Sequence, residues 1–354
     1  MKPKLRFLCL LLAVTLLCGC AAEKKTPQKY SASFFDAFDT VITVIAYADS
    51  QQQFDAVYSQ VKAMYTRYHQ VYDGYNAYPG VHNLYEVNAL AGQGPTPAEP
   101  ELIELLLYMK ELQPRLQGRV NVALGAVLSC WHQYREQGTA VPTMEELLPL
   151  SEHCDYDDVI IDQDAGTVCF ADPQLRIDLG AIAKGYATEI VASWMLTSGI
   201  PSYIISAGGN VRCGTKPLDG RDRWGVGIQD PLAALSQGGS SIMDVAYLTD
   251  TSAVTSGDYQ RYYTVDGVNY HHIIDPDTLM PSAFMHQVTV VTQDSGYADA
   301  LSTALFLMPY AQGRAFVDAL PDVEACWVLM DGSVQVTDGL LPALQSQGAT
   351  STDP

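Results

Sequence analysis

A helical segment near the C-terminal end places two oxygen-bearing side chains one turn apart. Asp299 and Thr303 stand at positions i and i+4 of the run 298–304, so both project from one helix face. A carboxylate beside a hydroxyl suits Mg²⁺, which takes oxygen ligands and completes its octahedron with waters and substrate phosphates. On these residues alone, a solvated or capping Asp299 with a packed Thr303 is the favoured alternative.

A second segment has the pattern of a phosphate-binding turn. The run Leu175–Leu179 predicts a strand, Gly180 allows a sharp turn, and small residues typical of a helix follow. The first turn of that helix would offer unpaired N–H groups at the positive end of its dipole, and Lys184 would add a full charge. This construction binds phosphate, although most strand–glycine–helix junctions bind nothing.

The N-terminus predicts export and lipid attachment. Three basic residues within the first six precede an apolar run, 7–17, that is shorter than a membrane span. The following Leu17-Cys18-Gly19-Cys20 resembles a bacterial lipobox. This implies a lipoprotein signal peptide over 1–19, a lipid on Cys20, and a tether over 20–33. We therefore expect the mature protein on the extracytoplasmic face of the bacterial cell membrane.

The composition excludes several functional classes. Asp and Glu number 40 against 20 Lys and Arg, and the net charge of −20 would repel nucleic acid. An anionic substrate would be repelled as well, unless amides, a lysine or a metal compensated its charge. Beyond Cys20 five cysteines remain without any Cys-x-x-Cys spacing. Buried free thiols are therefore expected rather than a disulfide framework or a zinc cluster.

Hydrophobic periodicity predicts an α+β fold with helices inserted between mixed sheets. Helices are predicted at 53–72, 101–116, 142–153, 185–198, 298–307 and 311–320, with a short one ending near 88. Strands are predicted at 38–47, 159–162, 167–170, 203–205, 224–229, 241–248, 253–255, 262–265 and 287–292, before a hairpin around 331–332. We expect two packed lobes with the active site in the cleft between them, one domain over 34–340, and a flexible tail over 341–354.

Six segments in a fixed order resemble the ApbE family of FAD:protein FMN transferases. They are Asp178–Ala187, Ser206–Asn210, Trp224–Pro231, Thr255–Tyr259, His272–Pro276 and Ala298–Ala304. The resemblance extends over about 34–339 and implies an ApbE-like fold. It also implies Mg²⁺-dependent transfer of FMN from FAD to a threonine or serine hydroxyl of an extracytoplasmic protein, with release of AMP. The acceptor would carry a Ser/Thr-Gly-Ala-Ser/Thr type sequence.

The resemblance further implies which residues form the site. A metal would be held by the Ala181 backbone carbonyl with Asp299 and Thr303, and Asp299 would be catalytic. Flavin and adenine contacts would fall at Phe38, Arg119, Val120, Asn121, Asp178, Lys184 and Ile273. His272, titrating near neutral pH beside Asp275, is the candidate general base, ahead of His271. A purely structural hydrogen bond from either ring is an equally supported alternative.

Two motifs depart from the family pattern. Val120-Asn121 stands where many relatives have Phe-Asp, so a carboxylate is lost. Asp277–Met280 stands where Arg-Thr-Gly is usual, so a basic group and a flexible glycine are lost. Two other functions stay open on the sequence: an FAD pyrophosphatase with water as the acceptor, and a surface lipoprotein that only binds flavin and would need no metal.

Overall fold

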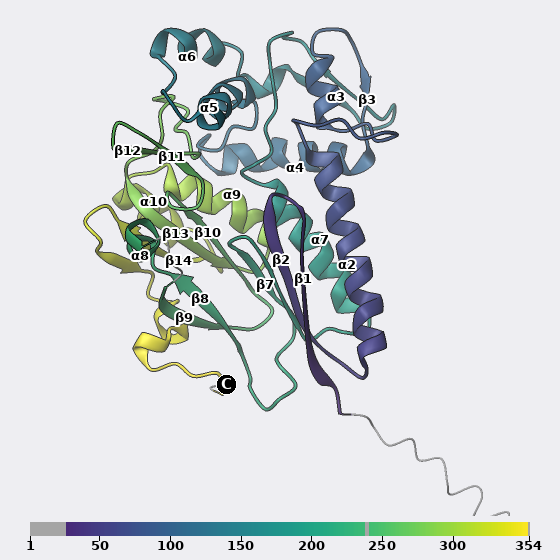
Figure 1. Cartoon of the computed structure of the whole chain (residues 1–354), viewed down its shortest axis with the longest axis vertical. Coiled ribbons are helices and arrows are strands. Elements are labelled where there is room, and N and C mark those ends of the chain that lie inside the picture. Colours follow the sequence, from purple (N-terminus) through teal and green to yellow (C-terminus); the bar gives the residue numbers. More distant parts are fainter. Residues whose placement is uncertain (1–25, 238–240, 353–354) are drawn as a thin grey trace, which may run out of the picture.

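The computed structural model describes residues 26–237 and 241–352, which form the mixed α+β architecture expected from the sequence (Figure 1). An eight-stranded antiparallel sheet lies at its centre. In sheet order its strands are β1 (Gln28–Ala37), β2 (Thr40–Ala48), β6 (Tyr203–Ala207), β7 (Asn210–Cys213), β10 (Ser252–Gly257), β13 (Met285–Thr292), β14 (Glu324–Leu329) and β15 (Val334–Val336).

The two faces of this sheet are covered differently. Three helices pack on one face: α2 (Gln51–Tyr72), α7 (Ala183–Thr197) and α9 (Ser295–Phe306). A two-stranded ribbon of β8 (Trp224–Gln229) and β9 (Ile242–Leu248) crosses the other face (Figure 1). Along β8 the side chains of Trp224, Val226 and Ile228 alternate inward onto a second apolar cluster, whereas Gly225 and Gly227 are exposed.

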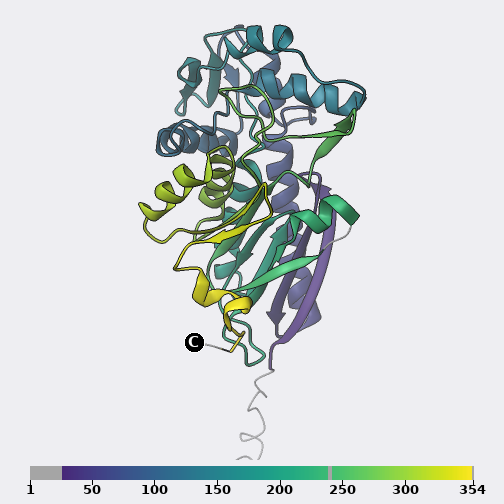
Figure 2. The same cartoon turned by 90° about the vertical axis from the view of Figure 1, so that its left-hand side faces the viewer.

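Smaller elements build a second lobe above the sheet (Figures 1 and 2). Its helices are α3 (Leu84–Ala89), α4 (Pro100–Arg115), α5 (Gly125–Gln137) and α6 (Met144–Ser151). Its strands are β3 (Thr96–Pro97), β4 (Val159–Asp162) and β5 (Thr167–Phe170), with the hairpin of β11 (Tyr262–Val265) and β12 (Val268–His271) alongside. The helices α8 (Pro231–Gln237) and α10 (Tyr310–Asp318), and short 3-10 turns at 156–158, 341–343 and 345–347, complete the fold.

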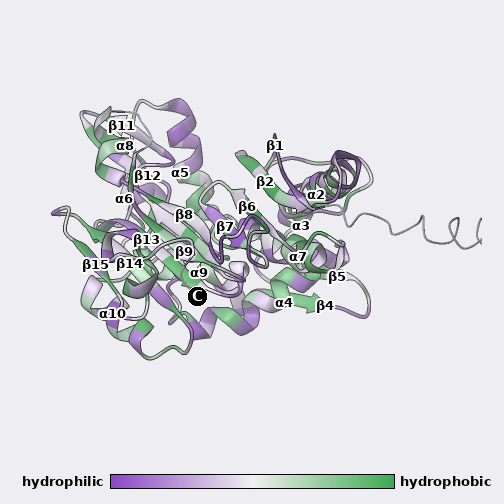
Figure 3. Cartoon of the chain, turned by 90° about the horizontal axis from the view of Figure 1, so that it is seen from below, coloured by the Kyte–Doolittle hydropathy of each residue, from purple (hydrophilic) through white to green (hydrophobic). Residues whose placement is uncertain are grey.

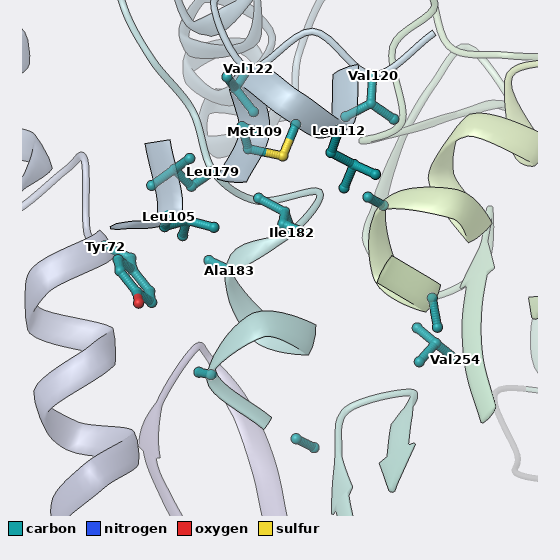
Figure 4. Close-up of a cluster of buried hydrophobic side chains, with 14 of the residues drawn as sticks. Tyr72, Leu105, Met109, Leu112, Val120, Val122, Leu179, Ile182, Ala183 and Val254 are labelled. Carbon is teal, nitrogen blue, oxygen red and sulfur yellow. The ribbon is translucent and has the colours of Figure 1, made fainter. Parts of the chain in front are cut away.

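The main apolar core joins the two lobes directly below the expected site. Leu105, Met109 and Leu112 of α4 face the segment that leads into α7, where Leu179 and Ile182 are buried (Figure 4). Burying such side chains contributes about 1.5–3 kcal/mol each. The turn before α7 is therefore anchored by packing rather than left as a free loop.

The strands are predominantly apolar, whereas α2 and α5 carry strongly polar stretches (Figure 3).

Two predicted boundaries differ from the structure. The predicted tether, 20–33, overlaps β1, which begins at Gln28 and pairs with β2 from Gln28 opposite Ala48. The predicted flexible tail is not loose in its described part, because Leu344 is buried and the Ser346 N–H donates to Asp244 of β9 at 3.1 Å. The residues from Gln28 to Ser33, and Leu344 with Ser346, are held against strand edges, which sequence periodicity does not show.

The predicted strand Leu175–Leu179 is not formed. Its backbone is held instead by the side chain of Asn88, whose amide bonds both the N–H and the carbonyl of Ile177 at 2.9 Å. The Asp178 N–H donates to the Val122 carbonyl at 2.9 Å. The extended residues therefore find partners in loops, and only Arg176 makes an isolated bridge, to Leu124.

The cysteines agree with the expectation of free thiols. Cys213 and Cys326 are buried, whereas Cys130, Cys154 and Cys169 are half-buried. Burial raises the pKa of the Cys213 thiol to about 12, so it is protonated at neutral pH.

None of the described helices combines the length and the apolarity that crossing a membrane requires. The predicted signal peptide and Cys20 lie outside the described residues.

Candidate active site

One large cavity, of about 1600 Å³, lies between the two lobes. Every candidate catalytic, flavin-contacting and metal-ligating residue predicted from the sequence lines it: Phe38, Arg119, Val120, Asn121, Asp178, Ala181, Lys184, His272, Ile273, Asp299 and Thr303. A pocket for one small ligand measures roughly 300–1,000 Å³. The cavity therefore has room for more than one such molecule.

Asp299 caps the first turn of α7 from the neighbouring helix α9. Its Oδ2 accepts the N–H of Gly185 at 2.8 Å, and its Oδ1 lies 3.5 Å from the Lys184 ammonium. An acidic group at a helix N-terminus is stabilised by the helix dipole. The carboxylate is buried, with 4% of the residue exposed, so it is not the solvated or self-capping residue considered as an alternative.

Close packing of α7 on α9 requires glycine at position 185. A Cβ there would collide with the Ser295 carbonyl and with the side chain of Asp299. The same helix pair is tied by Glu189, whose Oε2 accepts the Ser295 N–H at 2.8 Å and lies 3.3 Å from Arg212. The position of Asp299 relative to α7 is thus fixed by backbone contact and by a partly buried ion pair.

Lys184 is the second residue of α7, and its ammonium points toward buried oxygens. Its Nζ donates to Asn210 Oδ1 at 2.6 Å, in addition to the contact with Asp299. Asn210 belongs to the Ser206–Asn210 motif, for which no role is predicted from the sequence. The amide end of Asn210 holds the lysine in a fixed direction, because the Asn210 side chain is fully buried at the start of β7.

The expected phosphate site at this helix terminus is only partly open. The N–H of Gly185 is taken by Asp299, and those of Ala183 and Tyr186 by the Leu179 and Ile182 carbonyls at 2.8 and 2.9 Å. An anion here would be held mainly by the Lys184 charge rather than by several free amides. The turn itself begins at Gly180, as predicted, but two residues, Ala181 and Ile182, separate Gly180 from the helix.

Oxygen atoms that suit a hard cation line the cavity at Ala181, Asp299 and Thr303. Within the part of the chain that the structure describes, Thr303 Oγ1 makes a single long contact, 3.5 Å, to Ser256 Oγ. Among the described residues no hydrogen-bond donor reaches the Ala181 carbonyl oxygen. No cluster of three His, Cys, Asp or Glu side chains occurs in 26–237 and 241–352, so a zinc-type centre is not built there. One carboxylate with neutral oxygens fits Mg²⁺, which tolerates few protein ligands when phosphates complete the set.

Asp178 closes the turn that precedes α7. Its Oδ1 accepts the Gly180 N–H at 2.8 Å, and its Oδ2 accepts the Tyr75 hydroxyl at 2.8 Å. Burial and the Asp178 charge raise the pKa of Tyr75, which keeps the phenol protonated as a donor. The Tyr75 ring lies 4.7 Å from that of His132 on α5, so an aromatic surface borders the carboxylate.

The two departures from the family pattern meet in space. Arg119 Nη1 donates to Asp277 Oδ2 at 2.6 Å, so a basic group reaches the loop in which the usual arginine is missing. Leu279, at the position of the usual glycine, has φ +60°, the left-handed region that favours glycine. The loop therefore keeps a glycine-like turn, at a cost of about 1–2 kcal/mol. The Leu279 carbonyl accepts the Trp131 indole N–H at 2.9 Å, and this hydrogen bond helps to hold the conformation.

Asn121, which replaces the usual Asp, serves the fold as well as the cavity wall. Its amide donates to the Cys154 carbonyl at 2.8 Å, and its oxygen accepts the Ala123 N–H at 2.9 Å. Val120 beside it is buried and contributes an apolar contact. This wall of the cavity is consequently uncharged where many relatives carry a carboxylate.

Phe38 stands at the tip of the β1–β2 hairpin, on the wall facing His272. Both turn residues, Phe38 and Asp39, have positive φ values, 55° and 50°. The Phe38 ring packs 5.6 Å from that of His69, and its carbonyl accepts from Arg261 at 3.1 Å. The sequence did not single out Arg261, which connects this hairpin to the segment bearing the histidines.

His272 keeps one ring nitrogen free. Its Nδ1 faces the Arg261 carbonyl at 3.2 Å, and since a carbonyl only accepts, Nδ1 carries the proton and Nε2 keeps a lone pair. Desolvation, followed by the Arg261 charge, lowers the pKa of His272 to about 3. Asp275, which the sequence suggested as a partner of this ring, does not contact it. Asp275 is buried and accepts the Asp277 N–H at 2.9 Å instead.

His271 has a structural role. Its Nε2 donates to the Ser282 carbonyl at 2.7 Å, and its Nδ1 accepts the Ile273 N–H at 3.2 Å. Both nitrogens are thus committed inside the protein. Of the two histidines, only His272 lines the cavity, in agreement with the order of preference given by the sequence.

Comparison with known proteins decides the family. The ApbE family profile matches residues 38–327. The chain belongs to the ApbE family. A relative from Treponema pallidum, named FAD:protein FMN transferase, is 32% identical over 271 residues, 73% of this chain and 74% of that protein. Another of that name, from Vibrio cholerae, is 32% identical over 63% of this chain and 67% of its own length.

Solved structures place the fold in the same family. The ApbE protein of Thermotoga maritima has a TM-score of 0.77 and 27% identity, and the match covers 88% of this chain and 98% of that one. The apo flavinyl transferase ApbE of Pseudomonas stutzeri has a TM-score of 0.75 over 92% of this chain, at 23% identity. The expected ApbE-like architecture is thereby confirmed.

Proposed function

We propose that this protein transfers FMN from FAD to a threonine or serine hydroxyl of an acceptor protein, with release of AMP. One observation carries the proposal: Lys184, Asp299 and Thr303 converge on a cavity that also presents the free Nε2 of His272. The family membership and the names of the relatives support the same reaction.

Mg²⁺ would be held by Asp299, Thr303 and the Ala181 carbonyl, where it would offset diphosphate charge and favour departure of AMP. Lys184 would bind a diphosphate oxygen, with Asn210 keeping the ammonium in place. In a protein of net charge −20, this local positive charge is what allows a diphosphate to approach. Positioning and charge stabilisation supply most of the catalysis in phosphoryl transfer.

The bond changes follow from this arrangement. The acceptor hydroxyl oxygen attacks the phosphorus on the FMN side, the bond from that phosphorus to the bridging oxygen breaks, and AMP leaves with that oxygen. The hydroxyl proton passes to Nε2 of His272. The product is a phosphodiester between FMN and the acceptor. The acceptor is expected to be an extracytoplasmic protein with a Ser/Thr-Gly-Ala-Ser/Thr type sequence.

Incubation with FAD and Mg²⁺, with and without a peptide of that type, tests the proposal. We expect AMP and peptide-bound flavin in equal amounts only when the peptide is present. AMP without bound flavin would identify an FAD pyrophosphatase. Bound FAD without any AMP would identify a flavin-binding protein and contradict the proposal.

Replacing Lys184 by Met should weaken FAD binding by about 10–100-fold, because a charged hydrogen bond contributes about 1.5–3 kcal/mol. The loss should be larger at low salt, where neighbouring carboxylates are least screened. Flavin fluorescence titration at several salt concentrations measures it. Lys62→Met is the matched control, since Lys62 pairs with Asp36 at the surface, away from the cavity. Equal FAD affinity in the two variants would contradict the role of Lys184.

We propose further that the protein is anchored by lipid on Cys20, on the strength of the Leu17-Cys18-Gly19-Cys20 sequence. Anchoring would hold the transferase on the extracytoplasmic face of the membrane, where its acceptor is expected. Cys20→Ser should block lipidation and leave the protein unprocessed or released. Intact mass of the membrane fraction checks this, and a mature wild-type chain without acyl mass would refute it.

A further inference from the structure

The outer edge of β8 is an unpaired strand edge beside the active-site cavity. Within the described residues β8 pairs only with β9, and no other backbone hydrogen bond reaches 224–229. Such an edge presents a row of free N–H and carbonyl groups to any second chain.

Both edges of the large sheet and the outer edge of β9 are protected, whereas β8 is not. The edge of β1 carries Lys29 and Asp36 and a bulge between Phe34 and Ala37. β15 has only three residues, and the outer edge of β9 is covered by the turns at 341–347. The sequence Trp-Gly-Val-Gly-Ile-Gln of β8 contains no charge and no proline. Glycine inside a strand often marks a close approach by another backbone.

The cavity extends to this edge, because residues 226–229 of β8 line it. Residues of β6, β7, β10 and β13 in the large sheet line the cavity as well. The lining residues, here called the β8 groove, are Ser206, Val211, Val226, Gly227, Ile228, Gln229, Ala253, Thr255 and Thr289. None of these side chains is charged, so the groove suits a neutral polypeptide better than a second anionic ligand.

The β8 groove leads to the phosphate end of the site. Gly208 and Gly209, with φ values of 53° and 94°, form the turn between β6 and β7 and also line the cavity. A Cβ at Gly208 would collide with Thr40, so only a residue without a side chain fits at this part of the cavity rim. The next residue is Asn210, which holds Lys184. A chain lying along β8 would therefore reach the diphosphate position.

We infer that the acceptor protein docks by adding an extended segment to the outer edge of β8, antiparallel or parallel, within the β8 groove. This rests on the proposed function, and it assigns the docking surface of that reaction. Main-chain hydrogen bonds to β8 supply the affinity, and the uncharged floor selects small neutral side chains. The Ser/Thr-Gly-Ala-Ser/Thr type sequence meets both conditions.

Backbone methylation of the acceptor tests the docking mode. Two versions of a neutral synthetic peptide with a Ser-Gly-Ala-Thr segment are N-methylated at alternate residues outside that segment, one on odd and one on even positions. In an added strand only one set of amides faces β8. We expect methylation of that set to lower kcat/KM for labelling by about 10-fold or more, and methylation of the other set to have little effect. Equal effects of both sets overturn the inference while leaving the transferase activity in place.

Amide hydrogen exchange separates docking from chemistry. The probe is the unmethylated peptide with both hydroxyl residues of the segment replaced by alanine, which cannot accept FMN. We expect slower exchange in 224–229 when it is bound to the full chain with FAD, and unchanged exchange in β15 as the control edge. Protection elsewhere, or none, overturns the inference. Protection of β8 together with failure of the hydroxyl peptide to yield AMP would instead refute the proposed function alone.

Discussion

Replacing Asp299 by Asn is expected to reduce FMN transfer by at least about 10²-fold, the usual loss when one preorganised electrostatic group is removed from an active site. The amide oxygen of asparagine can still accept the Gly185 N–H, which lies 2.8 Å from Asp299 Oδ2. Only the charge is lost, and with it the carboxylate that is assigned to the divalent cation. Alanine would be less informative, because it would leave a buried N–H unpaired and destabilise the junction of α7 and α9.

The measurement is single-turnover labelling of an acceptor peptide over a range of Mg²⁺ concentrations. We expect the remaining activity to require far more Mg²⁺ than the wild type does. Asp294→Asn is the matched control, since Asp294 caps the same helix, α9, but does not line the cavity. Transfer by Asp299→Asn at the wild-type rate and Mg²⁺ requirement would remove the metal assignment.

The sequence predicted which residues meet in the cavity better than it predicted how they are held. Asp299 and Thr303 were found because helical spacing alone places them on one face. The contact of Asp299 with Gly185 spans 114 positions of the chain and depends on how α7 packs on α9. Periodicity describes one element at a time, so a cap supplied by a different helix leaves no local pattern.

The same limit explains the errors at the ends of the domain. Gln28–Ser33 is largely polar and 341–347 is too short to show the regular spacing of a buried element, yet both are ordered against strand edges. Backbone pairing, which is blind to side-chain hydropathy, stabilises both segments, and burial of Leu344 adds to it in the second. For Leu175–Leu179 the opposite holds: the residues favour a strand, but the neighbouring positions are occupied by loops and by the Asn88 amide.

The pKa of His272 could not be anticipated from its type or its neighbours in sequence. Asp275, three residues on, suggested a carboxylate partner that would favour the charged ring. In the structure that carboxylate turns to the Asp277 N–H, and Arg261 lies beside the ring instead. A cation and a desolvated site both disfavour protonation, so the two effects act in the same direction.

Replacing His272 by Asn should slow FMN transfer by about 10²-fold, the low end of the usual contribution of a general base, because a lowered pKa makes the ring a weaker proton acceptor. FAD affinity should change little, because binding of the diphosphate is assigned to Lys184, Asp299 and Thr303 rather than to His272. Added imidazole should restore part of the rate in a His272→Gly variant, which a purely structural histidine would not permit. His82→Asn is the control, since His82 pairs with Glu86 at the surface.

The pH dependence of transfer follows from the lowered pKa of His272, about 3. The ring accepts a proton only when neutral, and it remains neutral throughout pH 5–8, so its titration should leave the wild-type rate flat there.

The stability of the fold, in contrast, falls on acidification. In the unfolded chain this histidine takes up its proton near pH 6.5, so the unfolded state binds more protons than the folded state between pH 6.5 and 3. Stability attributable to His272 is therefore present above pH 6.5 and lost as the pH falls toward 3. Labelling rate and urea unfolding, measured at the same pH values, separate the two effects. A rate that falls tenfold between pH 7 and 6 with unchanged stability, and only when His272 is present, would show that the ring titrates near neutrality and is not the desolvated base described here.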